Sequence, residues 1–244
     1  MVCLPLCFIQ HTKVGQMVDN LYSFNHINGY TSGPVVMNPQ EFDSLELELT
    51  SKCTLACPSC ARELHKDVQD QWDGGHLPLD LVKSIADTTN FKRYNLVGCY
   101  GDVIYHPDFI EICEYYLSRN KNLIIHTNGA FRTSAWWDRL SSLEWKNTEF
   151  FFSVDGLEDT NHIYRKNSKW SSVLLGMEKM TAIPKERRPN LIWKFIEFPY
   201  NQHQIEQARN LATQLGFDNF ETVKSVRTAE QYYLTAQKEL YVFS

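Results

Sequence analysis

The sequence predicts an α/β protein, namely a partial (β/α)6-type barrel with parallel strands. Segments with strand character alternate with segments of helical spacing from about residue 44 to residue 226. About five or six such strand–helix units fit into this length, fewer than the eight units of a closed barrel. A chain of 244 residues with 43% hydrophobic residues also has the size and composition of a single α/β domain.

The strands are recognised by alternation or by short apolar runs. In residues 44–50, three leucines (Leu45, Leu47 and Leu49) alternate with Glu46 and Glu48. This period of two indicates a strand with one buried face. Further strands are expected within residues 94–102, 122–129, 149–156, 191–198 and 220–226.

A helix is expected after each of the first five strands. The segments with helical spacing are residues 78–85, 107–119, 134–143, 170–181 and 202–215. Pro78 suits a first helical turn, Ser134 an N-cap and Gly216 a C-terminal stop. Repeated strand–helix units of this kind predict a parallel sheet with right-handed crossovers.

The chain is expected to consist of one barrel core with two flanking segments. Residues 1–43 have no sustained period and are interpreted as an irregular N-terminal lead-in that caps one end of the barrel. Residues 44–226 form the predicted core, and residues 227–244 are assigned as a C-terminal extension.

Charge and hydropathy give no sign of nucleic acid or membrane as a partner. The net charge is −5, the pI is about 5.9, and lysine and arginine are scattered along the chain. A nucleic-acid-binding surface normally requires clustered positive charge. The apolar first residues lack a basic region and are interrupted by Pro5, and no stretch approaches the roughly 18 apolar residues that cross a bilayer. A cytoplasmic location is therefore expected.

Three of the seven cysteines, Cys53, Cys57 and Cys60, are crowded into one loop directly after the first predicted strand. This crowding fits metal ligands in a reducing compartment better than a disulfide framework. Cubane iron–sulfur clusters are normally held by four thiolates, so three would leave one iron open to a substrate or cofactor. Alternatively, the three cysteines and His65 form a closed zinc site in a noncatalytic binding module.

Polar residues also follow the second, third and fourth predicted strands. In parallel α/β sheets, ligands bind beyond the carboxyl ends of the strands, so these residues are expected to converge with the cysteines. They are Gly101, Asp102, Thr127, Asn128, Ser153 and Asp155. On the fifth strand, Lys194 and Glu197 fall on opposite faces, so at most one is expected to line the interior.

The Cys53-x3-Cys57-x2-Cys60 loop after a first strand resembles the radical S-adenosylmethionine (radical SAM) superfamily. The resemblance extends over about residues 44–226. Tyr100-Gly101-Asp102 resembles the family's glycine-glutamate motif, Thr127-Asn128-Gly129 its third-strand turn, and Ser153-Val154-Asp155-Gly156 its fourth-strand end. The sequence departs from the family where Ser59 replaces a frequent aromatic residue, where aspartate replaces glutamate at position 102, and where Val103 replaces a common proline.

This resemblance implies a [4Fe–4S] cluster on the three cysteines and S-adenosylmethionine (SAM) on its open iron. An electron would then cleave the sulfonium to methionine and a 5′-deoxyadenosyl radical, which abstracts hydrogen from a substrate. By position in the family's motifs, Asp102 would accept hydrogen bonds from the methionine ammonium. Ser153 and Arg165 would contact the SAM carboxylate, and Thr127, Asn128 and Asp155 would reach the ribose hydroxyls.

The resemblance leaves the substrate open. No cysteine follows Cys113, so a single cluster without C-terminal auxiliary clusters is expected. The leading interpretation is an enzyme for a peptide or other small biosynthetic substrate, because a partial barrel leaves one side open to an extended ligand. A nucleoside- or cofactor-modifying enzyme is the alternative, and either requires an external electron donor. The remaining cysteines, Cys3, Cys7, Cys99 and Cys113, are interpreted as core residues, although Cys99 lies near the proposed site.

Overall fold

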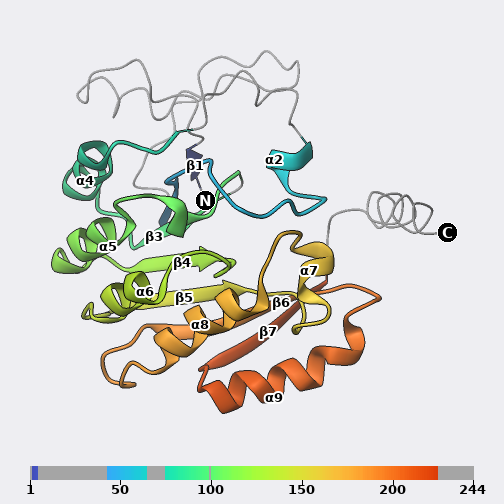
Figure 1. The fold of residues 1–244 in the computed structure, drawn as a ribbon. Coiled ribbons are helices and arrows are strands. Elements are labelled where there is room, and N and C mark those ends of the chain that lie inside the picture. The colour runs from blue at the N-terminus through green and yellow to red at the C-terminus, as the bar shows by residue number, and fades with distance from the viewer. Residues whose placement is uncertain (1, 5–42, 65–74, 99, 225–244) are drawn as a thin grey trace.

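The structure, a computed structural model drawn in Figure 1, describes residues 2–4, 43–64, 75–98 and 100–224. Its centre is a seven-stranded sheet in the order β1-β2-β3-β4-β5-β6-β7, and every neighbouring pair is parallel. The first and last strands do not pair with each other, so the sheet is open. The predicted fold class, a partial barrel of parallel strands, is confirmed.

The strands are short and lie in chain order. They are β1 (Val2–Leu4), β2 (Ser44–Glu48), β3 (Arg93–Val97), β4 (Leu123–Thr127), β5 (Thr148–Ser153), β6 (Asn190–Glu197) and β7 (Asn219–Lys224).

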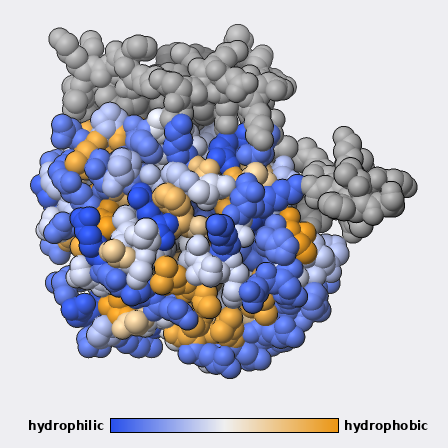
Figure 2. Space-filling model, in the orientation of Figure 1, coloured by the Kyte–Doolittle hydropathy of each residue, from blue (hydrophilic) through white to orange (hydrophobic). Residues whose placement is uncertain are grey.

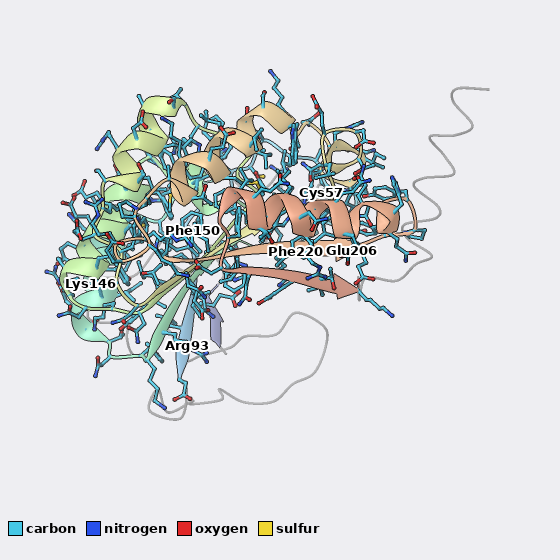
Figure 3. The ribbon with its side chains drawn as sticks, turned by 90° about the horizontal axis from the view of Figure 1, so that it is seen from below. Cys57, Arg93, Lys146, Phe150, Glu206 and Phe220 are labelled. Carbon is cyan, nitrogen blue, oxygen red and sulfur yellow. The ribbon has the colours of Figure 1, made fainter. Side chains whose placement is uncertain are left out.

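Helices connect the strands and cover the outer side of the curved sheet, as Figure 3 shows. The five long ones are α4 (Leu79–Thr88), α5 (Phe109–Ser118), α6 (Ser134–Ser141), α8 (Trp170–Thr181) and α9 (Ile205–Leu215). The shorter helical turns are α2 (Ala61–Leu64), η3 (Val103–Tyr105), α7 (Asn161–Tyr164) and η4 (Gln202–Gln204).

The core lies between the sheet and these helices. One row of side chains crosses five strands in register: Leu47, Leu96, Ile125, Phe150 and Leu191. All five side chains are fully buried. Burial of a large apolar side chain contributes roughly 1.5–3 kcal/mol, so this row holds the strands in one register. The leucines of the first predicted strand face this core, as expected.

The opposite face of the sheet forms the barrel interior, and it is more polar. In β2, Glu48 is 2% exposed, although the sequence pattern assigned it to the face opposite the leucines. Its Oε1 accepts hydrogen bonds from Tyr100 N at 2.5 Å and Gly101 N at 3.2 Å. In a barrel, the second face of a strand lies against other chain segments, which explains the burial of this carboxylate.

Several predicted boundaries need correction. Val2–Leu4 forms a strand beside β2, where an irregular lead-in was expected. The N-cap of α6 is Thr133, whose Oγ1 accepts from Trp136 N at 3.4 Å, and not Ser134. Pro78 precedes α4 as its N-cap residue instead of lying in its first turn. Gly216 ends α9 with φ = 93°, as predicted. Residues 5–42 and 225–244 lie outside the described residues.

The surface of the described part is mixed in polarity. Figure 2 shows hydrophilic residues surrounding smaller hydrophobic areas. Within the described ranges, Ile163 is the large hydrophobic side chain that is exposed, at 41%. None of the helices described is long and apolar enough to cross a membrane.

Trp193 provides a test of the core. Its side chain is fully buried, and its Nε1 donates to Val154 O at 2.9 Å. The substitution Trp193→Phe is expected to lower the free energy of unfolding by about 2–4 kcal/mol, because it leaves a cavity and an unpaired carbonyl. Urea denaturation followed by circular dichroism measures the effect. Trp170→Phe, at a half-buried position, is the control and is expected to cost less than about 1 kcal/mol.

Candidate cofactor and substrate site

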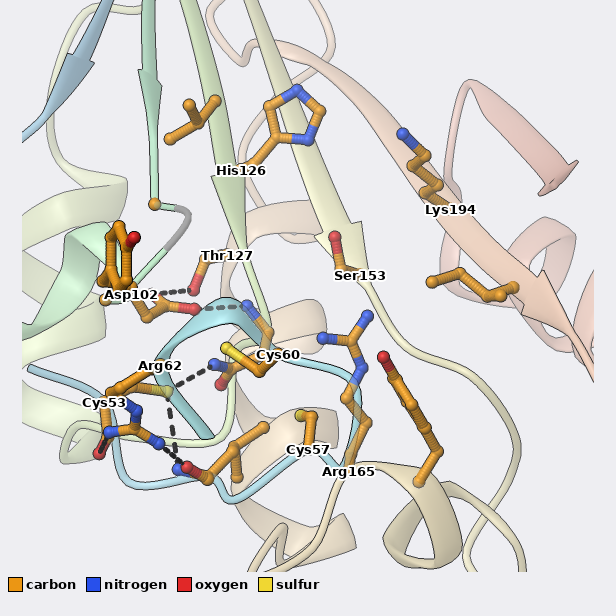
Figure 4. Close-up of a pocket in the computed structure, with 18 residues that line it drawn as sticks. Cys53, Cys57, Cys60, Arg62, Asp102, His126, Thr127, Ser153, Arg165 and Lys194 are labelled. Atoms are coloured by element: carbon orange, nitrogen blue, oxygen red, sulfur yellow. Dashed lines mark hydrogen bonds between the residues drawn. The ribbon is translucent and has the colours of Figure 1, made fainter. Parts of the chain in front are cut away.

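A single pocket of about 330 Å3 brings most of the candidate site residues together (Figure 4). It lies where the cysteine loop passes the carboxyl ends of the strands. The predicted residues that line it are Cys53, Cys57, Cys60, Gly101, Asp102, Thr127, Asn128, Ser153 and Arg165. Asp155 does not line it. Position 99 lies outside the described residues, and so do His65 and Cys7.

The cysteine loop is held by its own backbone and by Arg62, which sequence analysis did not select. The Arg62 guanidinium donates to Cys53 O at 2.8 Å and also to Leu55 O. Cys60 N donates to Cys57 O at 2.9 Å, which closes a tight turn between the second and third cysteines. These bonds give the loop a defined shape before any ligand binds. Arg62 directly follows the loop in the sequence, but no pattern distinguishes it from a surface arginine.

The surroundings of two loop cysteines, Cys53 and Cys57, disfavour the charged thiolate form. Burial, and then the nearby Asp102 carboxylate, raise the pKa of Cys53 to about 12. Burial also raises the pKa of Cys57, against the opposing effect of Arg165. A cationic metal centre reverses this preference, because it stabilises the thiolate. The donor set therefore fits an iron–sulfur cluster, and Asn128 Nδ2 lies 3.4 Å from Cys53 Sγ as a donor to that sulfur.

A mononuclear metal site makes a different geometric demand. Within the described ranges, no group of three His, Cys, Asp or Glu side chains is placed to hold one metal ion. A zinc ion requires every sulfur within about 2.3 Å of one point. In a cubane, each thiolate binds its own iron, so the sulfurs need not converge on one point.

Asp102 connects the segments that follow β3 and β4. Its Oδ1 accepts from Thr127 Oγ1 at 2.7 Å and Ile104 N at 3.2 Å, and its Oδ2 accepts from Asn128 N at 2.7 Å. Burial raises the pKa of this carboxyl, although these donors oppose the shift. A carboxylate has about four acceptor positions, so Asp102 retains room for a further donor from the pocket.

Gly101 owes its place to close backbone packing. A Cβ at this position would lie 1.9 Å from Thr50 O. A Cβ at Gly98 would lie 2.1 Å from Gly101 O. A side chain at either position would therefore clash with the backbone and shift the segment that holds Asp102 at the pocket. Strand β3 ends at Val97, before the glycines that were assigned to the strand.

Asp155 positions Arg165 and does not face the pocket. The carboxylate is fully buried, and its Oδ2 accepts from Arg165 Nε at 2.6 Å while Oδ1 accepts from Ile196 N at 2.8 Å. In this structure Asp155 therefore holds Arg165, and its direct contact with a ligand stays a prediction. Burial lowers the pKa of Arg165, but the charge and hydrogen bond of Asp155, together with Cys57 and Tyr164, outweigh this effect, so the pKa is raised overall. The guanidinium remains charged and lines the pocket.

His126, Ser153 and Lys194 line the part of the pocket away from Cys53 and Cys57 (Figure 4). The His126 ring stacks on Phe151 with a centroid distance of 4.3 Å. Burial, and then the positive charge of Lys194, lower the pKa of His126 to about 4. His126 is therefore neutral near pH 7. Glu197 does not line the pocket, so of the two charged residues on this strand it is Lys194 that faces the interior.

Comparison with known protein families shows the family of the chain. Residues 47–196 match the family model of the radical SAM superfamily. The chain belongs to this superfamily. The resemblance predicted from the cysteine loop and the strand ends is thus confirmed at the level of the family, and it accords with the open parallel sheet.

One curated protein that resembles this chain is a cofactor-modifying protein. The chain is 25% identical over 183 residues to the tungsten-containing aldehyde ferredoxin oxidoreductase cofactor-modifying protein of Pyrococcus furiosus, covering 71% of this chain and 49% of that protein. The chain thus spans about half the length of this curated relative.

Solved radical SAM structures share the fold at low sequence identity. The structure of anSMEcpe with bound AdoMet and the Cp18Cys peptide has a TM-score of 0.55 and 16% identity, covering 74% of this chain and 50% of that one. Streptococcus suis SuiB bound to S-adenosylmethionine has a TM-score of 0.59 and 13% identity, covering 83% of this chain and 47% of that one. SuiB has also been solved with its precursor peptide SuiA.

The lowered pKa of His126 predicts a pH effect on stability. When the pKa of a histidine is lower in the folded than in the unfolded state, the folded protein loses stability as the pH falls from about 6.5 towards 4. His126→Phe keeps an aromatic ring against Phe151 but removes the titration. The loss of unfolding free energy between about pH 7 and pH 4.5 is expected to be about 1–2 kcal/mol smaller in this variant. Urea titrations at both pH values measure it, and equal losses in the two proteins would contradict the assigned pKa.

Proposed function

We propose that this chain is a radical SAM enzyme that binds a [4Fe–4S] cluster through Cys53, Cys57 and Cys60. The observation that carries the proposal is the meeting of these three cysteines with Asp102 and Arg165 around one pocket. The family match over residues 47–196 supports it. When bound, the cluster and SAM supply the reductive cleavage that yields methionine and a 5′-deoxyadenosyl radical, which abstracts hydrogen from the substrate.

The residues around the pocket have complementary tasks in this proposal. The Asp102 carboxylate accepts a hydrogen bond from the SAM ammonium, using the acceptor position that Thr127, Asn128 and Ile104 leave available. Gly101 allows the close backbone approach that places this carboxylate. Thr127 and Asn128 lie beside Asp102 at the end of β4 and are proposed to face the ribose. Asn128 also donates to Cys53 Sγ.

Arg165 is proposed to bind the SAM carboxylate. Its Nε is occupied by Asp155, and its guanidinium also contacts the Cys57 thiol while it lines the pocket. A planar guanidinium pairs well with a carboxylate, and a charge-assisted pair of this kind is stronger than a neutral hydrogen bond. Ser153 lines the same pocket and supplies a hydroxyl donor. Asp155 is thus a positioning residue for Arg165.

The substrate proposed first is a peptide or another small biosynthetic molecule. The open sheet leaves one side of the barrel accessible to an extended ligand. Structural neighbours solved with the Cp18Cys and SuiA peptides support this preference. Modification of a cofactor is the second candidate, and the cofactor-modifying relative from Pyrococcus furiosus favours it. Either reaction draws its electron from an external donor, and we propose a cytoplasmic setting.

The role of the cysteines is tested by a matched pair of substitutions. Cys57→Ala is expected to abolish both iron binding and 5′-deoxyadenosine release, because a cluster with two thiolate ligands is not retained. Cys113→Ala is the control, because Cys113 is fully buried in α5 and does not line the pocket. Iron analysis after anaerobic reconstitution and chromatography of the products with dithionite and SAM measure both properties.

The result discriminates between the classes of protein. The unsubstituted protein and Cys113→Ala are expected to be brown, to contain about four irons and to release 5′-deoxyadenosine. A colourless protein that holds zinc would identify a metal-stabilised binding module instead. Retention of iron and SAM cleavage by Cys57→Ala would contradict the cluster assignment.

The role of Arg165 is tested separately from that of the cluster. Arg165→Lys keeps the positive charge beside Asp155 but removes the guanidinium fork. The dissociation constant for SAM is expected to rise by about tenfold or more, with the iron content retained. Arg187→Lys is the control, because Arg187 is exposed and pairs with Glu144 outside the pocket. Equilibrium dialysis with labelled SAM measures the affinity, and equal affinity in both variants would remove the proposed contact.

A further inference from the structure

Three cationic side chains line the pocket within the described part of the chain, and they differ in how their charge is balanced. Arg62 lies 3.2 Å from Glu63 Oε1, and Arg165 lies 2.6 Å from Asp155 Oδ2. No acidic side chain among the described residues pairs with Lys194. This difference singles out Lys194, because a charge that is partly removed from water is normally paired.

The position of Lys194 on its strand directs it into the barrel. Lys194 lies opposite Ser153 of β5 in the sheet register and opposite Glu221 of β7 on the other side. Glu221 is exposed and forms no ion pair with it, although the two residues are neighbours on adjacent strands. The side chain of Lys194 instead lines the pocket and lies near enough to His126 to lower the pKa of that ring.

Two uncharged polar groups lie beside this ammonium. Ser153 Oγ and the His126 ring nitrogens form no hydrogen bond with any residue that the structure describes, and both side chains are half-buried. The ring stacks flat on Phe151, with an interplanar angle of 6°, so its orientation is restrained. A neutral imidazole carries one N–H donor, a serine one O–H donor and an ammonium three donors. The three side chains thus present donors, and one positive charge, to the same part of the pocket.

This part of the pocket is separate from the place proposed for the amino acid portion of SAM. That portion binds the open iron, and so it lies beside the cysteines. In Figure 4, Lys194 and His126 lie on the side of Ser153 that faces away from Cys53 and Cys57. Arg165, and not Lys194, borders the cysteines there.

We infer that Lys194 and His126 form a subsite for an anionic group of the substrate, either a carboxylate or a phosphate, and that Ser153 lies at the border between this subsite and the SAM carboxylate. The inference rests on the proposed function. It narrows the substrate class to molecules that carry a carboxylate or a phosphate in addition to the hydrogen to be abstracted. An ammonium binds either anion as a compact point charge, whereas the N–H of the neutral imidazole orients the anion through a hydrogen bond.

The test measures anion binding by the cluster-loaded, SAM-bound protein. Equilibrium dialysis with radiolabelled acetate and with inorganic phosphate is carried out on the unsubstituted chain and on Lys194→Met and Lys194→Arg. The unsubstituted chain is expected to bind one equivalent of at least one anion. Lys194→Met is expected to weaken this binding by about tenfold or more, and Lys194→Arg by less than about threefold. Lys224→Met, at an exposed lysine on β7 outside the pocket, is the control and is expected to retain the binding.

The outcomes separate this inference from the function on which it rests. Stronger binding of acetate identifies a carboxylate, as in an acidic peptide, and stronger binding of phosphate identifies a phosphorylated small molecule. Failure of both anions to bind, or equal binding by Lys194→Met, overturns the subsite. An equal loss of SAM and anion affinity in Lys194→Met also overturns it, because Lys194 then belongs to the SAM site. The release of 5′-deoxyadenosine by the same preparation tests the proposed function independently.

Discussion

The parallel register of the strands is the constraint on which the site depends. Because every pair from β2 to β6 is parallel and in chain order, the carboxyl ends of these strands meet along one edge. The buried row from Leu47 to Leu191 on the helix side maintains this register. Asp102, Thr127 and Ser153 reach one pocket for this reason, although they are far apart in the sequence. The cysteine loop, shaped by Arg62, forms the remaining wall.

The charged side chains in and beside the pocket are paired or hydrogen-bonded, with the exception of Lys194. The buried Asp155 is paired with Arg165, and the buried Asp102 receives three hydrogen bonds. Such pairing is expected because an uncompensated charge in a partly dry site is costly. Lys194 has no corresponding partner among the residues described. A ligand that supplies an anion would complete the pattern, and this reasoning connects the electrostatics of the barrel interior with the choice of substrate.

Sequence patterns predicted the strands from β2 to β7 and the long helices, and they placed the candidate site residues at strand ends, because alternation and strand-end position depend on neighbouring residues. The cysteines and Asp102 were selected as candidates in this way, and they line one pocket. Glu48, Arg62 and His126 were not found, because a polar residue on a strand or after a loop has the same local pattern whether it faces solvent or a barrel interior. Asp155 was placed in the site by its strand end, but its contacts with Arg165 and Ile196 turn it away from the pocket. Only the folded arrangement distinguishes these cases.

In the proposed site, the three cysteines hold a cluster whose open iron binds SAM directly. Electron paramagnetic resonance of the dithionite-reduced protein, with and without SAM labelled with 15N in its amino group, is the decisive measurement of this contact. The expected result is the signal of a reduced [4Fe–4S] cluster that changes on addition of SAM and shows hyperfine coupling to the labelled nitrogen. A cluster signal that is the same with and without SAM, or the absence of any cluster signal from reconstituted protein, would contradict it.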